Sequence, residues 1–173
     1  TLCPADNPYG MSWGPDGILF GQSGRGILRV SVSGGTPETM VTVKDSEFAY
    51  GPQLLPDGQT VLFTLSTTPT DWDMSRVVVQ SLKSGERKTV VEGGSDAGYL
   101  PTGHIVYALG GVLFAVPFDV QRLQVTGVPV PIVEGVMRAG AGQTPVAQFS
   151  AATNGSLVFV SGPVSPSAGR LQQ

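Results

Sequence analysis

Short apolar runs separated by glycine- and proline-rich turns recur along the whole chain. In residues 27–32 every second position from Leu28 onward is apolar, and Arg29 and Ser31 lie between them. A period of two places successive side chains on opposite faces of a β-strand. No stretch keeps the 3.6-residue period of an amphipathic helix, so we expect almost no helix. The pattern predicts an all-β protein.

A turn recurs four times between these runs. Its copies are Pro15-Asp16-Gly17, Pro56-Asp57-Gly58, Pro101-Thr102-Gly103 and Thr153-Asn154-Gly155. Asp-Gly and Asn-Gly supply the positive φ that a tight turn requires, so each copy predicts a β-hairpin. Successive copies are separated by 41, 45 and 52 residues. Self-similarity at about 40–45 residues is typical of the four-stranded blades of a β-propeller.

The repeats predict a partial, open β-propeller of three four-stranded blades and part of a fourth. We expect one domain over residues 1–173, with blades at about 7–43, 46–92, 95–134 and 145–162. The last blade is incomplete, because the apolar pattern stops after its second strand. Since closed propellers contain about four to eight blades, we expect a piece of a larger ring.

Composition narrows the classes of partner. The formal net charge is −3 and the ten Lys and Arg residues are scattered, which argues against a nucleic-acid ligand. No apolar run approaches the ~20 residues of a membrane-spanning helix, so we expect no membrane span in this chain. Cys3 is the only cysteine, which excludes an intrachain disulfide.

Several segments resemble a known propeller family. Residues 11–20 (MSWGPDGILF), 27–37 (ILRVSVSGGTP) and 54–58 (LLPDG) resemble the WD40-like, TolB-like propeller repeat. Residues 113–119 (LFAVPFD) leading into 123–131 (LQVTGVPVP) are more similar to the C-terminal propeller of bacterial serine/threonine protein kinase-like proteins. The resemblance covers about residues 1–162.

The resemblance implies a propeller that serves as a sensor or interaction module in the periplasm or elsewhere outside the cytoplasm. It implies no kinase activity, because the chain has no glycine-rich loop with a catalytic lysine, no His-Arg-Asp loop and no Asp-Phe-Gly. The propeller family has no shared catalytic residues, so the resemblance implies fold and binding only.

Candidate catalytic and metal residues have simpler interpretations. Residues 10–14 (GMSWG) match the nucleophile-elbow pattern, but Ser12 lies in a predicted strand rather than on a strand-to-helix turn. His104, the only histidine, follows a turn, as an ordinary surface histidine would. Asp71 and Asp73 flank a tryptophan and could hold calcium, yet their spacing favours a solvated loop tip. We therefore expect no catalytic residue, no metal and no cofactor.

Tyr9 and Tyr50 are the candidate ligand-binding residues. They occupy the same position in successive repeats, seven residues before Asp16 and Asp57, where the chain enters the innermost strand beside the central channel. Aromatic rings there could stack on a sugar, a peptide or a partner loop. The alternative, packing between blades, is the commoner role of such side chains. A second aligned column is expected in the core: Trp13, Leu54 and Tyr99.

The leading hypothesis is a non-catalytic binding or protein-interaction module from an extracytoplasmic sensor, with a protein, peptide or glycan ligand. One alternative is part of a propeller-containing hydrolase of the peptidase or glycosidase type. Another is a self-assembling structural unit, because terminal blades expose unpaired edges. We expect a homo-oligomer in which two copies of about three and a half blades approximate a seven-bladed ring.

Overall fold

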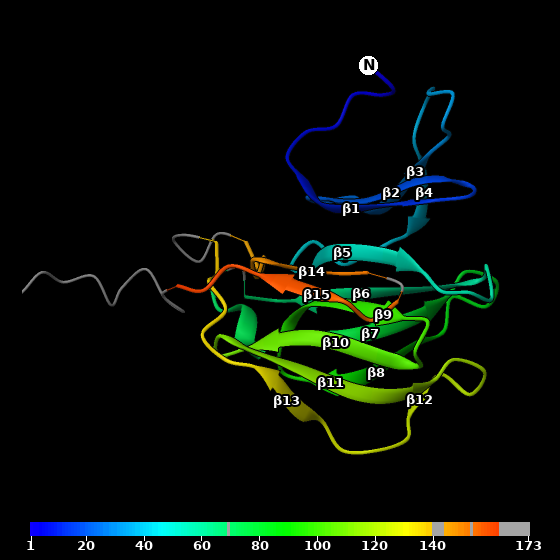
Figure 1. The fold of residues 1–173 in the computed structure, drawn as a ribbon. Coiled ribbons are helices and arrows are strands. Elements are labelled where there is room, and N and C mark those ends of the chain that lie inside the picture. The colour runs from blue at the N-terminus through cyan, green and yellow to red at the C-terminus, as the bar shows by residue number, and fades with distance from the viewer. Residues whose placement is uncertain (69, 140–143, 153, 163–173) are drawn as a thin grey trace, which may run out of the picture.

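The computed structural model describes residues 1–68, 70–139, 144–152 and 154–162, and it contains four antiparallel sheets that follow one another along the chain (Figure 1). The sheets do not close into a ring or a barrel. The all-β, open partial propeller predicted from the repeats is confirmed. In the described residues the only helical segment is a single 3₁₀ turn, η1 (Trp72–Met74).

The first two sheets each contain four strands in sequence order. The first comprises β1 (Pro8–Gly14), β2 (Gly17–Gln22), β3 (Gly26–Val30) and β4 (Glu38–Val41). The second comprises β5 (Phe48–Leu54), β6 (Thr60–Ser66), β7 (Arg76–Ser81) and β8 (Arg87–Glu92). Strand β3 ends at Val30, two residues earlier than the alternation suggests, because the chain turns at Ser31, whose carbonyl accepts the Gly34 N–H.

The third sheet has one strand more than expected. It comprises β9 (Ser95–Leu100), β10 (His104–Leu109), β11 (Val112–Asp119), β12 (Gln124–Val125) and β13 (Val130–Val133). Strand β11 is eight residues long, so β13 pairs with its first half and the short β12 with its end. The predicted connection between β11 and β13 therefore contains a small strand of its own.

The fourth sheet contains two strands, β14 (Phe149–Ala151) and β15 (Leu157–Phe159). Single bridges, Val136 with Ser161 and Arg138 with Ala147, attach the preceding segment to this sheet. The fourth predicted turn includes residue 153, and the segment 163–173 follows the sheet; both lie outside the described residues.

The Pro-Asp-Gly turns have the geometry that their residues predict. In the second turn the Asp57 carboxylate accepts the backbone N–H groups of Gln59 and Thr60, each at 3.0 Å, and Gly58 has a φ of 66°. In the first turn Gly17 has a φ of 127°, and a Cβ there would lie 2.3 Å from the Val30 carbonyl oxygen. Glycine is needed there for both conformation and space.

Apolar side chains between successive sheets form the core. Strand β6 contributes to both sides: Val61, Phe63 and Leu65 face the first sheet, and Leu62 faces the third. Because β6 is covered on both faces, side chains that point either way are buried, and all seven of its residues are. A third cluster, which includes Val106 and Leu113 of the third sheet and Ala147, joins the third sheet to the fourth.

The two ends of the array differ in how they are covered. On the outer face of the first sheet Cys3 packs against Phe20, Leu28 and Val30, and the Leu2 carbonyl accepts the Gly35 N–H at 3.0 Å. At the other end Val158 of β15 and the following Val160 remain 67% and 50% exposed.

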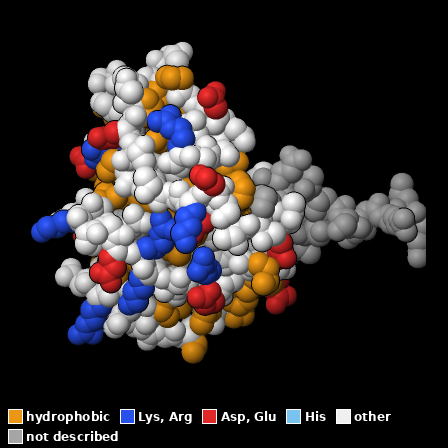
Figure 2. All heavy atoms as spheres, turned by 180° about the vertical axis from the view of Figure 1, so that it is seen from behind, with side chains coloured by type: hydrophobic (Ala, Val, Ile, Leu, Met, Phe, Trp, Pro, Cys, Tyr) orange, Lys and Arg blue, Asp and Glu red, His pale blue; other side chains and the backbone are white. Residues whose placement is uncertain are grey.

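Charged side chains of both signs are interspersed over the face of the molecule shown in Figure 2, with no continuous basic patch on it. Within the described part of the chain, no helix has the length and apolar character needed to cross a bilayer.

Replacing Leu62 tests the packing between the second and third sheets. Leu62 is fully buried, so Leu62→Ala should lower the free energy of unfolding by about 3 kcal/mol, through lost burial and the cavity left behind. Urea denaturation followed by circular dichroism measures this. The control Val128→Ala, at a position that is 77% exposed, should change stability by less than about 0.5 kcal/mol. Equal effects of the two substitutions would contradict the face-to-face packing.

Candidate functional site

The first strand of every sheet lines one cleft. Strands β1, β5, β9 and β14 all contribute to its wall, and its volume is about 650 Å³. In a propeller the first strand of each blade is innermost and borders the central channel. Because this propeller is open, its channel is a cleft. Its lining includes Ser12, Gln53, Ala97, Gly98 and Ser150.

The wall between the second and third sheets is fixed by one side chain. The Gln53 amide accepts the Tyr99 N–H at 2.7 Å and donates to the Tyr99 carbonyl at 3.1 Å. The Gln53 side chain therefore satisfies both backbone groups of Tyr99 in β9, in the way that a neighbouring strand does in a sheet. This part of the cleft is preorganised, which reduces the entropy lost when a ligand binds.

The inner strands of the first three sheets share an irregularity near their start. The register of β1, β5 and β9 shifts there, and the equivalent residues Gly10, Gly51 and Asp96 have φ values of 72°, 58° and 53°. A Cβ on Gly10 would lie 2.9 Å from the Gly51 nitrogen, so a side chain is excluded there. Asp tolerates the left-handed conformation better than most residues. The third repeat thus places a carboxylate in the cleft wall where the first two place none.

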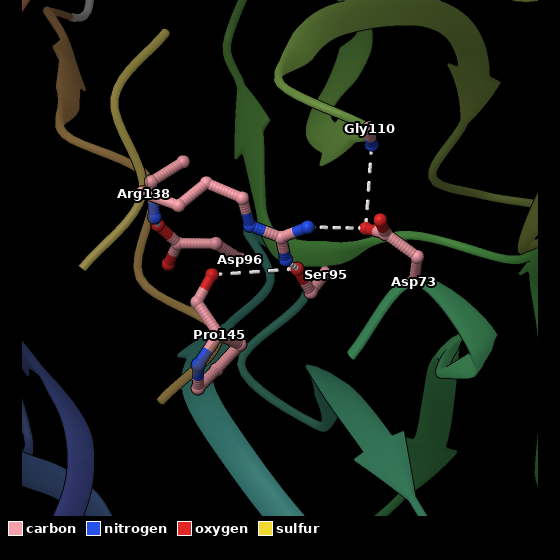
Figure 3. Close-up of polar contacts among 7 residues, drawn as sticks. Asp73, Ser95, Asp96, Gly110, Arg138 and Pro145 are labelled. Atoms are coloured by element: carbon pink, nitrogen blue, oxygen red, sulfur yellow. Dashed lines mark hydrogen bonds and ion pairs between the residues drawn. The ribbon is translucent and has the colours of Figure 1, made fainter. Parts of the chain in front are cut away.

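Asp96 lies beside a polar cluster, shown in Figure 3, that joins three parts of the chain. The Arg138 guanidinium, from the segment preceding the fourth sheet, pairs with the Asp73 carboxylate and donates to the Ser95 Oγ at 2.8 Å. The Asp73 carboxylate also accepts the Gly110 N–H at 3.3 Å. We name Asp73, Ser95, Asp96 and Arg138 the Arg138 cluster.

Two contacts extend the cluster toward the fourth sheet. The Ser95 hydroxyl donates to the Pro145 carbonyl at 3.3 Å, and the Asp96 Oδ2 accepts the Ala147 N–H at 2.9 Å. The adjacent residues Ser95 and Asp96 therefore hold the entry to the last sheet against β9. Removal of either side chain would leave buried backbone groups without these partners.

Burial sets the protonation of the acidic groups near the cleft. It raises the pKa of Asp96 to about 6, although the Ala147 N–H and the positive charge of Arg138 both act to lower it. Burial, followed by the nearby charge of Asp96, raises the pKa of the Tyr50 phenol, which a hydrogen bond with the Thr144 side chain partly offsets. Tyr50 is therefore protonated at neutral pH, and Asp96 exchanges its proton close to neutral pH.

The structure places Tyr9 and Tyr50 beside the cleft rather than in its lining. Tyr50 is buried, with its ring 6.0 Å from that of Trp72 in an edge-on contact. Tyr9 is half-buried and lies 6.3 Å from the Phe48 ring. Both contacts are packing contacts within and between sheets. The ligand-binding role of Tyr9 and Tyr50 stays a prediction, and a ligand could reach Tyr9 more readily than Tyr50.

Two interpretations drawn from the sequence are wrong. Trp13, expected in the core, is 72% exposed and lines the cleft, because β1 turns this position toward the channel rather than toward the second sheet. Asp73, expected at a solvated loop tip, is paired with Arg138, because η1 turns the connection back toward the segment before the fourth sheet. Leu54 and Tyr99 are half-buried and also line the cleft.

The remaining candidates do not form a catalytic set. Ser12 lies in β1 and lines the cleft. His104 begins β10, where its Nδ1 lies 3.0 Å from the Thr102 carbonyl oxygen, and it is not part of the cleft wall. Across the described residues no group of three or more His, Cys, Asp or Glu side chains could hold a metal ion.

Comparisons with known proteins identify the fold. No protein-family model and no curated protein matches the sequence. The structure is similar to regucalcin, a calcium-binding protein from Agrobacterium tumefaciens strain C58, with a TM-score of 0.59 and 11% identity over 87% of this chain and 50% of that one. It is also similar to a luciferin-regenerating enzyme, with a TM-score of 0.55 and 11% identity over 76% of this chain and 49% of the other.

Both neighbours are β-propellers, so the comparison supports a propeller fold. This chain spans about half the length of the solved structures that it matches. At 11% identity the likeness shows the fold alone, since one fold carries many unrelated functions.

The protonation of Asp96 should make stability depend on pH. A folded-state pKa raised from 3.8 to about 6 means that the folded protein loses stability as pH rises through this range and regains it as pH falls. Relative to Asp96→Asn, wild type should therefore gain about 1–2 kcal/mol in free energy of unfolding between pH 7 and pH 4. Chemical denaturation at several pH values measures the difference. Asp45 lies in an exposed loop, so the difference in free energy of unfolding between wild type and the control Asp45→Asn should not change with pH. If the difference between wild type and Asp96→Asn is also independent of pH, the raised pKa of Asp96 is refuted.

Proposed function

We propose that this chain is a non-catalytic binding module that holds its ligand in the central cleft. One observation carries the proposal: the inner strands of all four sheets line a single cleft of about 650 Å³, into which the exposed Trp13 projects. Ligand sites are typically concave, about 300–1,000 Å³, and mainly apolar with a few polar groups. An exposed tryptophan at such a place supports recognition rather than folding.

The ligand that the cleft fits best is a protein or peptide segment. The cleft is not enclosed, and the inner strands of all four sheets line it, which suits an extended chain better than an enclosed small molecule. Its wall offers apolar surface from Leu54 and Tyr99 together with hydroxyls from Ser12 and Ser150. A glycan that stacks on Trp13 is the alternative ligand. Calorimetric titrations with both peptides and glycans distinguish the two.

The setting that we propose for this module is a sensor outside the cytoplasm. Its support is the resemblance of residues 1–162 to the propellers attached to bacterial serine/threonine kinase-like proteins. The luciferin-regenerating enzyme supports a different function, an enzyme built on the same fold. Asp96 favours that alternative most, because a carboxyl in a cleft with a pKa of about 6 could serve as a general acid or base.

Trp13 tests the binding proposal. In calorimetric titrations with a panel of peptides and glycans, Trp13→Ala should weaken binding of the best ligand by about tenfold to a hundredfold, because a central tryptophan often dominates an interface. Trp72→Phe leaves Trp13 as the only tryptophan, so ligand binding should change the fluorescence of this variant.

Met74→Ala is the matched control, since Met74 is exposed yet lies outside the cleft. It should bind as wild type does. The proposal fails if no peptide or glycan binds, or if Trp13→Ala and Met74→Ala bind alike. Substrate turnover that Asp96→Asn abolishes would favour the enzymatic alternative instead.

We also propose that the chain self-associates through the apolar residues at 158 and 160. Strand β15 pairs only with β14, so its other edge has unpaired backbone groups in the described structure. Unpaired edges with apolar side chains favour pairing with another chain. A second copy that pairs one of its strands with this edge would extend the two-stranded fourth sheet.

Charges introduced at these positions should prevent the association. Light scattering coupled to size exclusion should show a dimer for wild type and a monomer for the double variant Val158→Lys and Val160→Lys, because lysine edges repel a partner strand. Val128→Lys, at another exposed valine, is the control and should remain dimeric. A wild-type protein that stays monomeric at high concentration would exclude this assembly.

A further inference from the structure

We infer that the ligand held in the cleft carries a basic side chain, lysine or arginine, that pairs with Asp96. This inference rests on the proposed binding function and specifies the chemistry of its ligand. Four features of the cleft support it: the charge balance around Asp96, the position of its carboxylate, the aromatic surface nearby and the charge of the remaining wall.

The charges around Asp96 do not balance. Two carboxylates, Asp73 and Asp96, lie near one guanidinium, that of Arg138. The nearby Tyr50 phenol, whose raised pKa reflects burial and the charge of Asp96, is neutral. Arg138 directs one nitrogen to the Asp73 carboxylate and the other to the Ser95 Oγ. Arg138 therefore forms its ion pair with Asp73. When the Asp96 carboxyl is ionised, the cluster keeps one negative charge that no cation among the described residues neutralises directly.

Backbone geometry directs this charge toward the cleft. Asp96 occupies the bulge position where Gly10 and Gly51 have no side chain, and its Oδ1 comes within 4.0 Å of the place where a Cβ on Gly51 would lie. Its Oδ2 accepts the Ala147 N–H, so the carboxylate is held in orientation by the backbone. Asp96 is half-buried and is one of the residues that line the cleft, so a group bound there would lie beside it.

Aromatic surface lies in the same wall. Trp13 and Tyr99 both line the cleft. A basic side chain places its methylene stem on apolar surface and its charged end on a carboxylate, and an aromatic face attracts the cation as well. Because Asp96 is half-buried, the attraction is screened less than at an exposed site.

No other charge in the described wall would repel a cation strongly. Arg29 also lines the cleft, but Glu38 neutralises it through a hydrogen bond of 2.7 Å from the Arg29 Nε. The remaining charged residue of the wall is Asp16, in the first turn, which adds to the negative potential. The wall therefore selects for positive charge.

Matched peptides test the inference. Capped pentapeptides of the sequence Ala-Leu-X-Leu-Ala, with X as lysine, arginine, norleucine or glutamate, differ only in the charge and shape of one side chain. In calorimetric titrations with the folded chain at pH 7.5, the lysine or arginine peptide should bind at least about tenfold more tightly than the norleucine peptide. The glutamate peptide should bind most weakly.

Asp96→Asn removes the charge and keeps the local structure, because asparagine accepts a backbone N–H and tolerates a positive φ. This variant should bind the basic and norleucine peptides alike, whereas Asp45→Asn, which changes net charge equally, should retain the wild-type preference. For wild type the preference should also decrease as pH falls from 7.5 to 5, and for Asp96→Asn it should not change. Circular dichroism checks that both variants are folded.

Each result separates the inference from the proposed function. If norleucine and basic peptides bind equally to wild type, or if Asp96→Asn keeps the preference, the basic-ligand inference is wrong while the binding function stands. If none of the peptides binds and the wider panel of peptides and glycans also gives no binding, both proposals fail. A preference that Asp96→Asn abolishes and Asp45→Asn retains supports the inference.

Discussion

Packing of each sheet against the next, face to face, is the constraint on which the rest of this structure depends. Strand β6 shows it most clearly, because Phe63 packs toward the first sheet while the adjacent Leu62 packs toward the third. A single sheet of this kind would expose one apolar face to water at a cost of about 25 cal/mol per Å². Stacking the sheets removes that cost and brings their first strands together. The cleft is thus a consequence of how the core is buried.

Close approach of the inner strands explains the second feature of the site. Gly10 lies so near Gly51 that a side chain at Gly10 is excluded, and the third repeat places Asp96 at the equivalent position. Burial disfavours the ionised form of this carboxyl, as its raised pKa shows, and the left-handed conformation adds backbone strain. Strained and desolvated groups are found most often where a protein binds or reacts. The Arg138 cluster compensates only part of this cost.

The repeats predicted the scaffold of the site better than its chemistry. Periodicity and turn residues located the inner strands and aligned Tyr9 with Tyr50, as well as Trp13 with Leu54. In the same alignment Asp96 is equivalent to Gly10 and Gly51. The sequence therefore already showed that the third repeat has an aspartate where the first two have glycine. This aspartate acquires meaning only when the left-handed backbone and the cleft are known. The similarity to two propellers at 11% identity likewise determines architecture and not ligand.

The sequence by itself determined the strands, the hairpin turns and the order of the sheets, because these depend on residues close together in the chain. Alternation also indicates that neighbouring side chains face opposite ways, but it does not say what covers each face. Only the tertiary structure decided that Trp13 faces the cleft and that Asp73 pairs with Arg138, 65 residues away. The physical reason is that exposure, ion pairing and protonation depend on which segments of the chain meet in space. The residues close to a position in the sequence do not determine which distant segments contact it.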